Sequence, residues 1–355
     1  MNDTMTKLGD VARECRQNWT GDQAGVPIVG LEHLVPGEYE LKAWDSDIEH
    51  TFSKKFEKGQ VLLGRRRVYL RKAVVAPCDG ICSGDITVIE STGGILPELL
   101  PFVIQNDRFF DYAMQGSAGS LSPRVKWDYL KNYEFSLPSL DEQRLLAEKL
   151  WSAYRLKESY KKLLAATDEM VKSQFIEMFG DPIKNSKKLP TRKGEELFVF
   201  SSGKANTKSN LSNDFPFNCY GGNGITGHSD QWLIDYPTIV IGRVGEYCGC
   251  VHKTHGKVWI TDNAIYIKEH KEKVFNETFL FYLMTYLDFH RLADETGQPK
   301  ITQRPLLTMD YIIPAKDLQE QFVAIAHQAD KSEFELRKSI EAIDKVIKSL
   351  INENV

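Results

Sequence analysis

The chain has 355 residues, of which 42% are hydrophobic and 26% are charged, and its formal net charge is -4. This content suffices for two hydrophobic cores, while no apolar run approaches the roughly 18 residues that span a bilayer. A polar N-terminal segment and only six cysteines exclude a secretory signal and a disulfide framework, so a cytoplasmic protein is expected. The negative charge excludes a general polyanion binder, because such proteins carry a basic excess.

Residues 1–137 combine short apolar runs with glycine and proline, which predicts an α+β globule. The clearest expected strands are Gln60–Leu63, Ala73–Val75 and Ile86–Ile89. Between the first two strands, the basic residues from Arg65 to Lys72 are interleaved with apolar ones in a stretch that reads as strand-like.

Residues 139–179 contain neither proline nor glycine, and their apolar side chains recur at helical spacing. The recurring positions are Leu146, Leu150, Tyr154, Tyr160, Leu164, Val171 and Phe175. A long amphipathic helix is therefore predicted, ended by Gly180-Asp181-Pro182.

A second globule followed by a second long helix is predicted for the rest of the chain. Strands are expected at Thr238–Ile241 and Ala264–Ile267, and a helix over residues 317–355. That helix carries a coiled-coil seam formed by Leu336, Ile340, Ile343, Ile347 and Leu350. Two helices of about 40 residues, roughly 60 Å each, can cover their apolar stripes by pairing antiparallel. The alternative is that each helix packs on its own globule.

The two halves repeat one another at a near-constant separation. Leu63-Gly64-Arg65 returns 178 positions later as Ile241-Gly242-Arg243, and Glu142-Gln143 returns as Glu320-Gln321. The segment from Ser83 to Ile89 returns at the same separation as Thr261 to Ile267. Leu121–Arg124 is matched to Ile301–Arg304 at a separation of 180 positions, and Leu137-Pro138 is matched to Ile313-Pro314 at a separation of 176 positions. These matches indicate a tandem duplication, with domains at residues 1–137, 138–180, 181–313 and 314–355.

Certain motifs resemble the specificity subunit of type I restriction-modification systems. They are Ile313-Pro314 with Asp317, Glu320 and Gln321 before a long helix, the run Ile241–Gly245, and the run Trp259–Ala264. The resemblance covers essentially the whole chain. In the first globule Arg66-Arg67 replace Val244-Gly245, and Gly84-Asp85 replace Asp262-Asn263, as expected of two domains that read different sequences.

The resemblance implies two target-recognition domains that each read half of a bipartite double-stranded DNA target. It also implies that the helices act as a ruler and as a docking surface for methyltransferase (modification) subunits, with a restriction/translocase subunit as a further partner. The chain itself is then a non-catalytic subunit without a cofactor, and S-adenosylmethionine is expected on the methyltransferase partner.

DNA reading requires Lys and Arg for phosphates, and Arg, Asn or Gln for base edges. The candidates of the first globule are Arg65, Arg66, Arg67, Tyr69, Arg71, Lys72, Ser117, Ser120, Ser122 and Arg124. Those of the second are Lys204, Asn206, Lys208, Tyr220, Asn223, Arg243, Lys300, Gln303 and Arg304. For each of them an ordinary surface or turn role is the alternative.

Catalytic motifs are not supported. Gly222–Gly227 matches the dinucleotide fingerprint literally, but the sequence that follows predicts no helix to bind a pyrophosphate. The chain has no Gly-Lys-Ser/Thr phosphate loop and no Asn/Asp-Pro-Pro-aromatic methyltransferase motif. Cys248, Cys250, His252 and His255 could converge on zinc if their segment were a strand, although the usual cysteine spacing is missing. The alternative for them is a buried strand face with a surface histidine.

Two other functions remain open at this level. One is the recognition subunit of a combined restriction-methylation enzyme that cuts on both sides of its site. The other is a scaffold whose globules bind protein rather than DNA.

Overall fold

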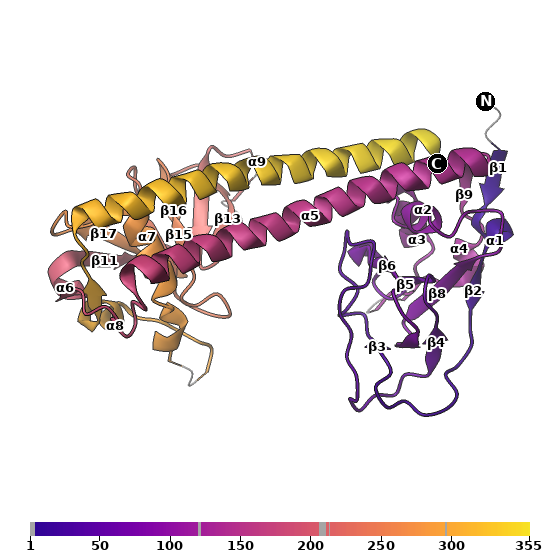
Figure 1. The fold of residues 1–355 in the computed structure, drawn as a ribbon, viewed down its shortest axis with the longest axis horizontal. Helices are drawn as coiled ribbons and strands as arrows, with labels where there is room; N and C mark the ends of the chain where they lie inside the picture. Colours follow the sequence, from indigo (N-terminus) through magenta and orange to yellow (C-terminus); the bar gives the residue numbers. More distant parts are fainter. Residues whose placement is uncertain (1–3, 120–121, 206–210, 213, 295–296) are drawn as a thin grey trace. The chain divides into compact units, whose positions relative to one another are not determined.

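The computed structural model describes the chain except residues 1–3, 120–121, 206–210, 213 and 295–296. The chain divides into two compact units, Met1–Lys162 with Leu336–Val355, and Leu163–Glu335. Each unit contains one globule and part of each of the two long helices, α5 (Leu140–Phe179) and α9 (Lys316–Asn354) (Figure 1). Among the described residues, no helix is both long and apolar enough to cross a membrane.

The first globule is built on a four-stranded antiparallel sheet in the order β2-β8-β5-β6. A three-stranded sheet, β3-β7-β4, and the pair β1-β9 complete it, and β3 runs parallel to β7. The strands are β1 (Thr4–Lys7), β2 (Ala12–Cys15), β3 (Ile28–Val29), β4 (Lys54–Phe56), β5 (Val61–Gly64), β6 (Ala73–Val75), β7 (Gly80–Cys82), β8 (Ile86–Ser91) and β9 (Glu134–Leu137). The helices are α1 (Leu8–Val11), the 3-10 turn η1 (Val68–Leu70), α2 (Leu100–Ile104), α3 (Asp107–Gln115) and α4 (Trp127–Leu130).

The second globule repeats this topology. Its four-stranded sheet has the order β11-β17-β14-β15, its three-stranded sheet the order β13-β12-β16 with β12 parallel to β16, and β10 pairs with β18. The strands are β10 (Thr191–Lys193), β11 (Phe198–Ser202), β12 (Phe217–Gly221), β13 (Gly224–Ser229), β14 (Ile239–Gly242), β15 (Val251–Lys253), β16 (Val258–Ile260), β17 (Ala264–His270) and β18 (Asp310–Ile312). The helices are α6 (Gly194–Leu197), α7 (Glu277–Tyr286), the 3-10 turn η3 (Phe289–Leu292) and α8 (Gln303–Thr308). The predicted α+β duplication is confirmed.

In each globule the four-stranded sheet is buried on both faces, which explains its continuous apolar strands. Val61 and Leu63 of β5 enter the larger core, whereas Leu62 between them enters a smaller core on the opposite face. In β14, Ile239 and Ile241 likewise enter the larger core and Val240 the smaller one. The alternation follows from the two-residue period of a strand.

The long helices take part in both larger cores, and they run antiparallel. In the first unit Leu150 and Tyr154 of α5 share a core with Ile347 and Ile351 of α9. In the second unit Phe175 of α5 shares a core with Phe322 and Ala326, which lie near the start of α9. The start of one helix therefore packs with the end of the other, as an antiparallel pair requires. The alternative that each helix packs only on its own globule is wrong.

The limits of α5 have local causes in the sequence. Ser139 and Glu142 form a capping box: the Ser139 hydroxyl donates to Glu142 Oε2 at 2.7 Å, and the Ser139 backbone N–H donates to the same oxygen at 3.0 Å. At the other end Gly180 adopts a φ of 76°, a left-handed conformation that favours glycine. The predicted helix and its glycine stop are confirmed.

A buried glutamine attaches each long helix to its globule. Gln143, 1% exposed, accepts a hydrogen bond from Leu96 N at 2.9 Å and donates to Gly94 O and Pro138 O.

Gln319, also 1% exposed, accepts a hydrogen bond from Asn276 N at 2.8 Å and donates to Val274 O and Pro314 O. Gln143 therefore corresponds to Gln319, which lies 176 positions later, and the match of Gln143 to Gln321 is wrong. The separation of 176 agrees instead with the match of Leu137-Pro138 to Ile313-Pro314.

Candidate nucleic-acid interface

Three segments meet at one edge of the first globule, and we call them the first junction: Arg65–Arg67 after β5, Asp85 before β8, and Pro123–Val125. Backbone hydrogen bonds close it. Arg65 N donates to Asp85 O at 2.9 Å, Val125 N donates to Arg65 O at 3.0 Å, and Arg67 N donates to Pro123 O at 2.8 Å.

The second globule has the same closure at its second junction: Arg243–Gly245, Asn263 and Pro299–Ile301. Arg243 N donates to Asn263 O at 2.9 Å, Ile301 N donates to Arg243 O at 2.9 Å, and Gly245 N donates to Pro299 O at 2.9 Å. Because a backbone pattern of this detail recurs in both units, the two junctions are equivalent sites.

The equivalence corrects the matching of the third segment. Pro123-Arg124-Val125 corresponds to Pro299-Lys300-Ile301, again 176 positions apart, so the match of Leu121–Arg124 to Ile301–Arg304 is wrong. The sequence did contain the signal, because each triplet is proline, a basic residue and a β-branched apolar residue.

The stretch from Arg65 to Lys72 is a tight loop, so its prediction as strand-like is wrong. Its centre is the turn η1, and Arg67 and Arg71 on either side have φ values of 52° and 53°. At the same places in the second globule stand Gly245 and Gly249, with φ values of 78° and 91°. Positive φ costs a residue with a side chain roughly 1 to 2 kcal/mol, so the first globule keeps two arginines in a conformation that suits glycine.

The side chains of the first junction form a charged cluster around Asp85. Arg124 donates to Asp85 through Nε at 2.6 Å and through Nη2 at 3.1 Å, and Arg66 Nη1 lies 3.6 Å from the same carboxylate. Arg66 Nε also donates to Ser122 Oγ at 2.6 Å. The hydrogen bonds from Arg124, which outweigh the effect of partial burial, hold the pKa of the Asp85 carboxyl below its ordinary value.

The second junction is built differently at the side-chain level. Asn263 replaces Asp85, Val244 replaces Arg66 and Lys300 replaces Arg124. The turn after β12 packs against it so closely that a Cβ on Gly242 would lie 2.4 Å from Gly222 O. The glycine that this close approach requires is therefore Gly242, whereas a Cβ on Gly222 would meet its nearest neighbour, Asn263 O, at 3.4 Å. The strand β13 follows the literal dinucleotide fingerprint instead of a helix.

Several predicted DNA-contact residues form bonds within their own globule. Arg71 forms ion pairs with Asp107 and Asp111 of α3, and Lys72 Nζ donates to Leu31 O at 2.7 Å. These bonds tie the loop to its own globule.

In the second globule, Tyr220 is 6% exposed and its hydroxyl lies 3.4 Å from Lys253 O. The Gln303 side-chain amide faces β11. In the orientation in which both its nitrogen and its oxygen are hydrogen-bonded, it donates to Phe200 O at 3.1 Å and accepts from Ser202 N at 3.3 Å. Because the side chains of Arg71, Lys72, Tyr220 and Gln303 are held by these bonds, we do not propose them as base or phosphate contacts.

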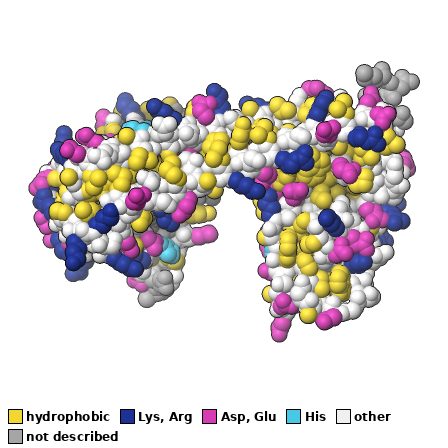
Figure 2. Space-filling view, in the orientation of Figure 1, with side chains coloured by type: hydrophobic (Ala, Val, Ile, Leu, Met, Phe, Trp, Pro, Cys, Tyr) yellow, Lys and Arg dark blue, Asp and Glu magenta, His cyan; other side chains and the backbone are white. Residues whose placement is uncertain are grey.

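The remaining candidates stay predictions. Arg67, Tyr69, Arg124, Lys204, Asn223, Lys300 and Arg304 are exposed, while Arg65, Arg66, Ser117, Ser122 and Arg243 are half-buried. Ser120, Asn206 and Lys208 lie outside the described residues. In Figure 2 basic and acidic side chains are interspersed on both globules, and the face shown has no uninterrupted basic surface.

The cysteine-histidine group does not form a common strand face. Cys248 and Cys250 precede β15 in a turn, Cys248 Sγ contacts Arg243 O at 3.3 Å, and His255 lies beyond the strand. Both the predicted zinc site and its alternative, a buried strand face, assumed that Cys248 and Cys250 lie on a strand, and this assumption is wrong. All six cysteines are within the described part of the chain, and none of them forms a disulfide there.

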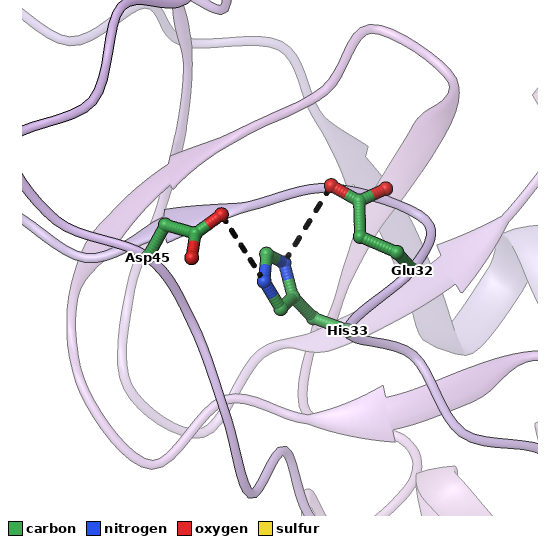
Figure 3. A group of neighbouring side chains, drawn as sticks. All are labelled: Glu32, His33 and Asp45. Atoms are coloured by element: carbon green, nitrogen blue, oxygen red, sulfur yellow. Dashed lines mark ion pairs between the residues drawn. The ribbon is translucent and has the colours of Figure 1, made fainter. Parts of the chain in front are cut away.

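The described residues contain one group with the spacing of metal ligands, Glu32, His33 and Asp45 (Figure 3). His33 Nε2 lies 3.4 Å from Asp45 Oδ2, and His33 Nδ1 lies 3.9 Å from Glu32 Oε1. Because Nδ1 already accepts the Gly30 backbone N–H at 3.0 Å, the group is explained as a device that fixes its own loop.

Comparison with known proteins agrees with this architecture. Residues 187–344 match the family described as Type I restriction modification DNA specificity domain. The resemblance to type I specificity subunits is confirmed. The Type I restriction enzyme EcoprrI specificity subunit of Escherichia coli is 27% identical over 128 residues, which cover 36% of this chain and 30% of that subunit.

Solved structures of type I proteins share the fold. The S subunit of the type I restriction-modification system from M. genitalium superposes with a TM-score of 0.60 at 13% identity, over 99% of this chain and 95% of that one. A chain from a study of complex assembly and conformational transition of the type I R-M system superposes with a TM-score of 0.54 at 15% identity, over 100% of this chain and 98% of that one. At these identities the likeness establishes the fold.

Proposed function

We propose that this chain is the DNA-specificity subunit of a type I restriction-modification complex. In this proposal the first and second junctions each read one half of a bipartite double-stranded DNA target. The observation that carries the proposal is the pair of junctions, identical in backbone closure and different in side chains. One scaffold with two sets of reading groups is what a target with two different halves requires.

The division of roles follows from the chemistry of DNA. Exposed Lys204, Lys300 and Arg304 are suited to phosphates, because a lysine or arginine charge fixes position without reading sequence. Arg124 and Arg243 are suited to base edges, because a planar guanidinium can donate two parallel hydrogen bonds to one base.

The antiparallel helices complete the proposal as the docking surface for methyltransferase subunits, which would bring S-adenosylmethionine, and for a restriction subunit. The chain then acts in the cytoplasm and contributes recognition, while its partners contribute the chemistry.

Methylation-site mapping tests the proposal. The chain is expressed with the modification subunits of its own host, and the methylated positions in genomic DNA are aligned. The expected result is one bipartite motif, and R243A should relax one half of it by about 1 to 3 kcal/mol for the lost base contact while the other half stays unchanged. Equal loss in both halves would contradict independent reading by the two globules.

The salt dependence of DNA binding separates this function from a protein-binding scaffold. A DNA reader that neutralises several phosphates loses affinity steeply with salt, with a log–log slope of about -0.9 per phosphate contact. Binding to a target duplex that does not respond to salt would favour the scaffold.

A further inference from the structure

Asp85 is the only acidic residue among the segments of the first junction, and it contacts two of their arginines. Its side chain is 19% exposed, whereas those of Arg66 and Arg124 are 40% and 42% exposed. The carboxylate thus lies beneath two guanidinium groups that reach solvent. It holds Arg124 through two hydrogen bonds, at Nε and at Nη2.

The duplication provides a natural control for what these ion pairs do. The second junction closes with the same backbone hydrogen bonds although Asn263 stands in place of Asp85, and Val244 in place of Arg66. The backbone closure of such a junction therefore does not need a carboxylate. What the carboxylate adds in the first globule is the orientation of the arginine side chains.

The hydrogen bonds of Arg124 define what remains for a ligand. Asp85 uses the Nε–H and one N–H of Nη2, so the N–H groups of Nη1 and the other N–H of Nη2 stay available. These can donate in parallel to two acceptors that lie side by side. In the major groove, guanine presents such a pair, N7 and O6.

We propose that Asp85 is a positioning residue that presents Arg124, flanked by Arg66, to a guanine in the half-site read by the first globule. This inference rests on the proposed function and names the base that the first junction selects. Fixing the long Arg124 side chain before binding reduces the rotamer freedom lost on binding. The carboxylate also repels phosphates, so its presence lowers affinity for DNA in general.

These two effects of Asp85 have opposite signs, and the substitution D85N separates them. Non-specific affinity should rise, by about twofold or more at low salt, because a negative charge is removed near the DNA. Discrimination at one guanine of the first half-site should fall by at least about fivefold, because Arg124 is no longer held. A variant that merely damages the globule would lose both kinds of binding.

The experiment uses the full chain in complex with its modification subunits. Affinity is measured for a duplex that lacks the site, and half-site selectivity by methylation of a duplex library randomised at each position. R124K is a second variant, because lysine keeps the charge but cannot form the fork, and it should lose about 5- to 100-fold selectivity at the same guanine. D10N is the matched control. Asp10 is exposed and precedes β2, whose Ala12 pairs with Ser91 at the end of β8 remote from Asp85.

Loss of selectivity at one guanine of the first half-site in both D85N and R124K, with D10N unchanged, supports the inference. Unchanged selectivity in D85N, or a loss at another base or in the second half-site, overturns it. If D85N fails to fold, R124K alone decides, because full selectivity in that variant also overturns it. A wild-type complex that modifies no bipartite site would instead overturn the proposed function.

Discussion

Arginine occupies two backbone positions in the first globule where the second globule has glycine. Arg71 is held there by Asp107 and Asp111, so its conformation has a structural explanation. Arg67 is exposed at the junction and has a φ of 52°. A strained residue that remains in a loop suggests that its side chain is needed there, and DNA contact is the need that the proposed function supplies.

The substitution R67G tests this trade between stability and function. It should raise the free energy of unfolding by up to about 1 kcal/mol, because glycine accepts positive φ without steric cost, and it should weaken DNA binding. Chemical denaturation and DNA titration measure the two effects. K188G is the control, because Lys188 is exposed with a φ of 54°, so it undergoes the same backbone and charge change outside both junctions. A variant R67G that binds DNA as tightly as wild type would leave the strain at Arg67 without this explanation.

At the scale of single elements, the buried glutamines define how each long helix begins on its globule. Gln143 and Gln319 each bond one backbone N–H and two backbone carbonyls. Because one buried side chain bonds three backbone groups, the helix is attached in one register and one direction.

Replacing either glutamine by alanine should destabilise the unit to which it belongs. Q143A or Q319A removes three hydrogen bonds made by a buried side chain, which should lower the free energy of unfolding by about 2 to 4 kcal/mol. Hydrogen exchange should locate the loss near residues 94–96 in Q143A and near 274–276 in Q319A. The control is Q321A, since Gln321 is exposed two positions away, and it should change stability by less than about 0.5 kcal/mol. If Q321A lowered the free energy of unfolding as much as Q319A, the assignment of Gln319 as the residue that attaches α9 would be wrong.

A charged cluster attaches the middle of α5 to the loop that contains Glu38. Burial by itself raises the pKa of Glu38, but hydrogen bonds from Lys161, Lys42 and Tyr154 outweigh it and lower the pKa to about 2, from an ordinary value of 4.5. A carboxyl with a lowered folded-state pKa stabilises the fold above its unfolded pKa, and this contribution is lost as pH falls toward the folded value.

The pH dependence of E38Q follows from that sign. At pH 7 the variant should be about 1 to 3 kcal/mol less stable than wild type, because two lysines lose their buried partner. The difference should stay constant down to about pH 5 and narrow as the pH falls toward about 2, as urea unfolding at a series of pH values would measure. E49Q, at an exposed glutamate of the same globule, should differ little at any pH. A gap that widened on acidification would refute the assigned role of Glu38.

At the scale of the whole molecule, two equivalent junctions and an antiparallel helix pair suit a ruler for a bipartite target. The ion pair of Lys157 with Asp344, at 2.5 Å, and the shared cores join α5 to α9. We propose that the length of this helix pair sets the non-specific gap between the half-sites.

Equal insertions in both helices test the ruler. Seven residues after Lys162 in α5 and seven after Glu335 in α9 add about 10 Å at about 1.5 Å per residue and keep a heptad seam in phase. The gap in the methylated motif should lengthen by about three base pairs, with both half-sites unchanged. Four residues inserted after Lys162 alone add about 6 Å to α5. If the apolar seam between α5 and α9 accommodates them, the gap in the methylated motif should lengthen by about one or two base pairs. An unchanged gap in a complex that still methylates its site would rule out the ruler.

The sequence by itself determined the elements with strong periodicity and the order in which they occur. The long helices, the paired apolar seam and strands such as Ala73–Val75 were predictable, because helix and strand periods are local properties of the chain. The duplication was predictable too, since homologous segments keep their order. The family resemblance rested on the same segments.

Tertiary structure decided the register of the repeat and the roles of individual polar residues. The segment from Arg65 to Lys72 is a tight loop, because Arg67 and Arg71 take positive φ on either side of η1. No local sequence pattern indicated this backbone conformation. Gln143 corresponds to Gln319, and Arg124 to Lys300, because backbone bonds across the fold establish those equivalences. Asp85 gains its importance only from two arginines that lie 19 and 39 residues away in the chain. The physical reason is that hydrogen bonds and ion pairs depend on which segments the fold brings together.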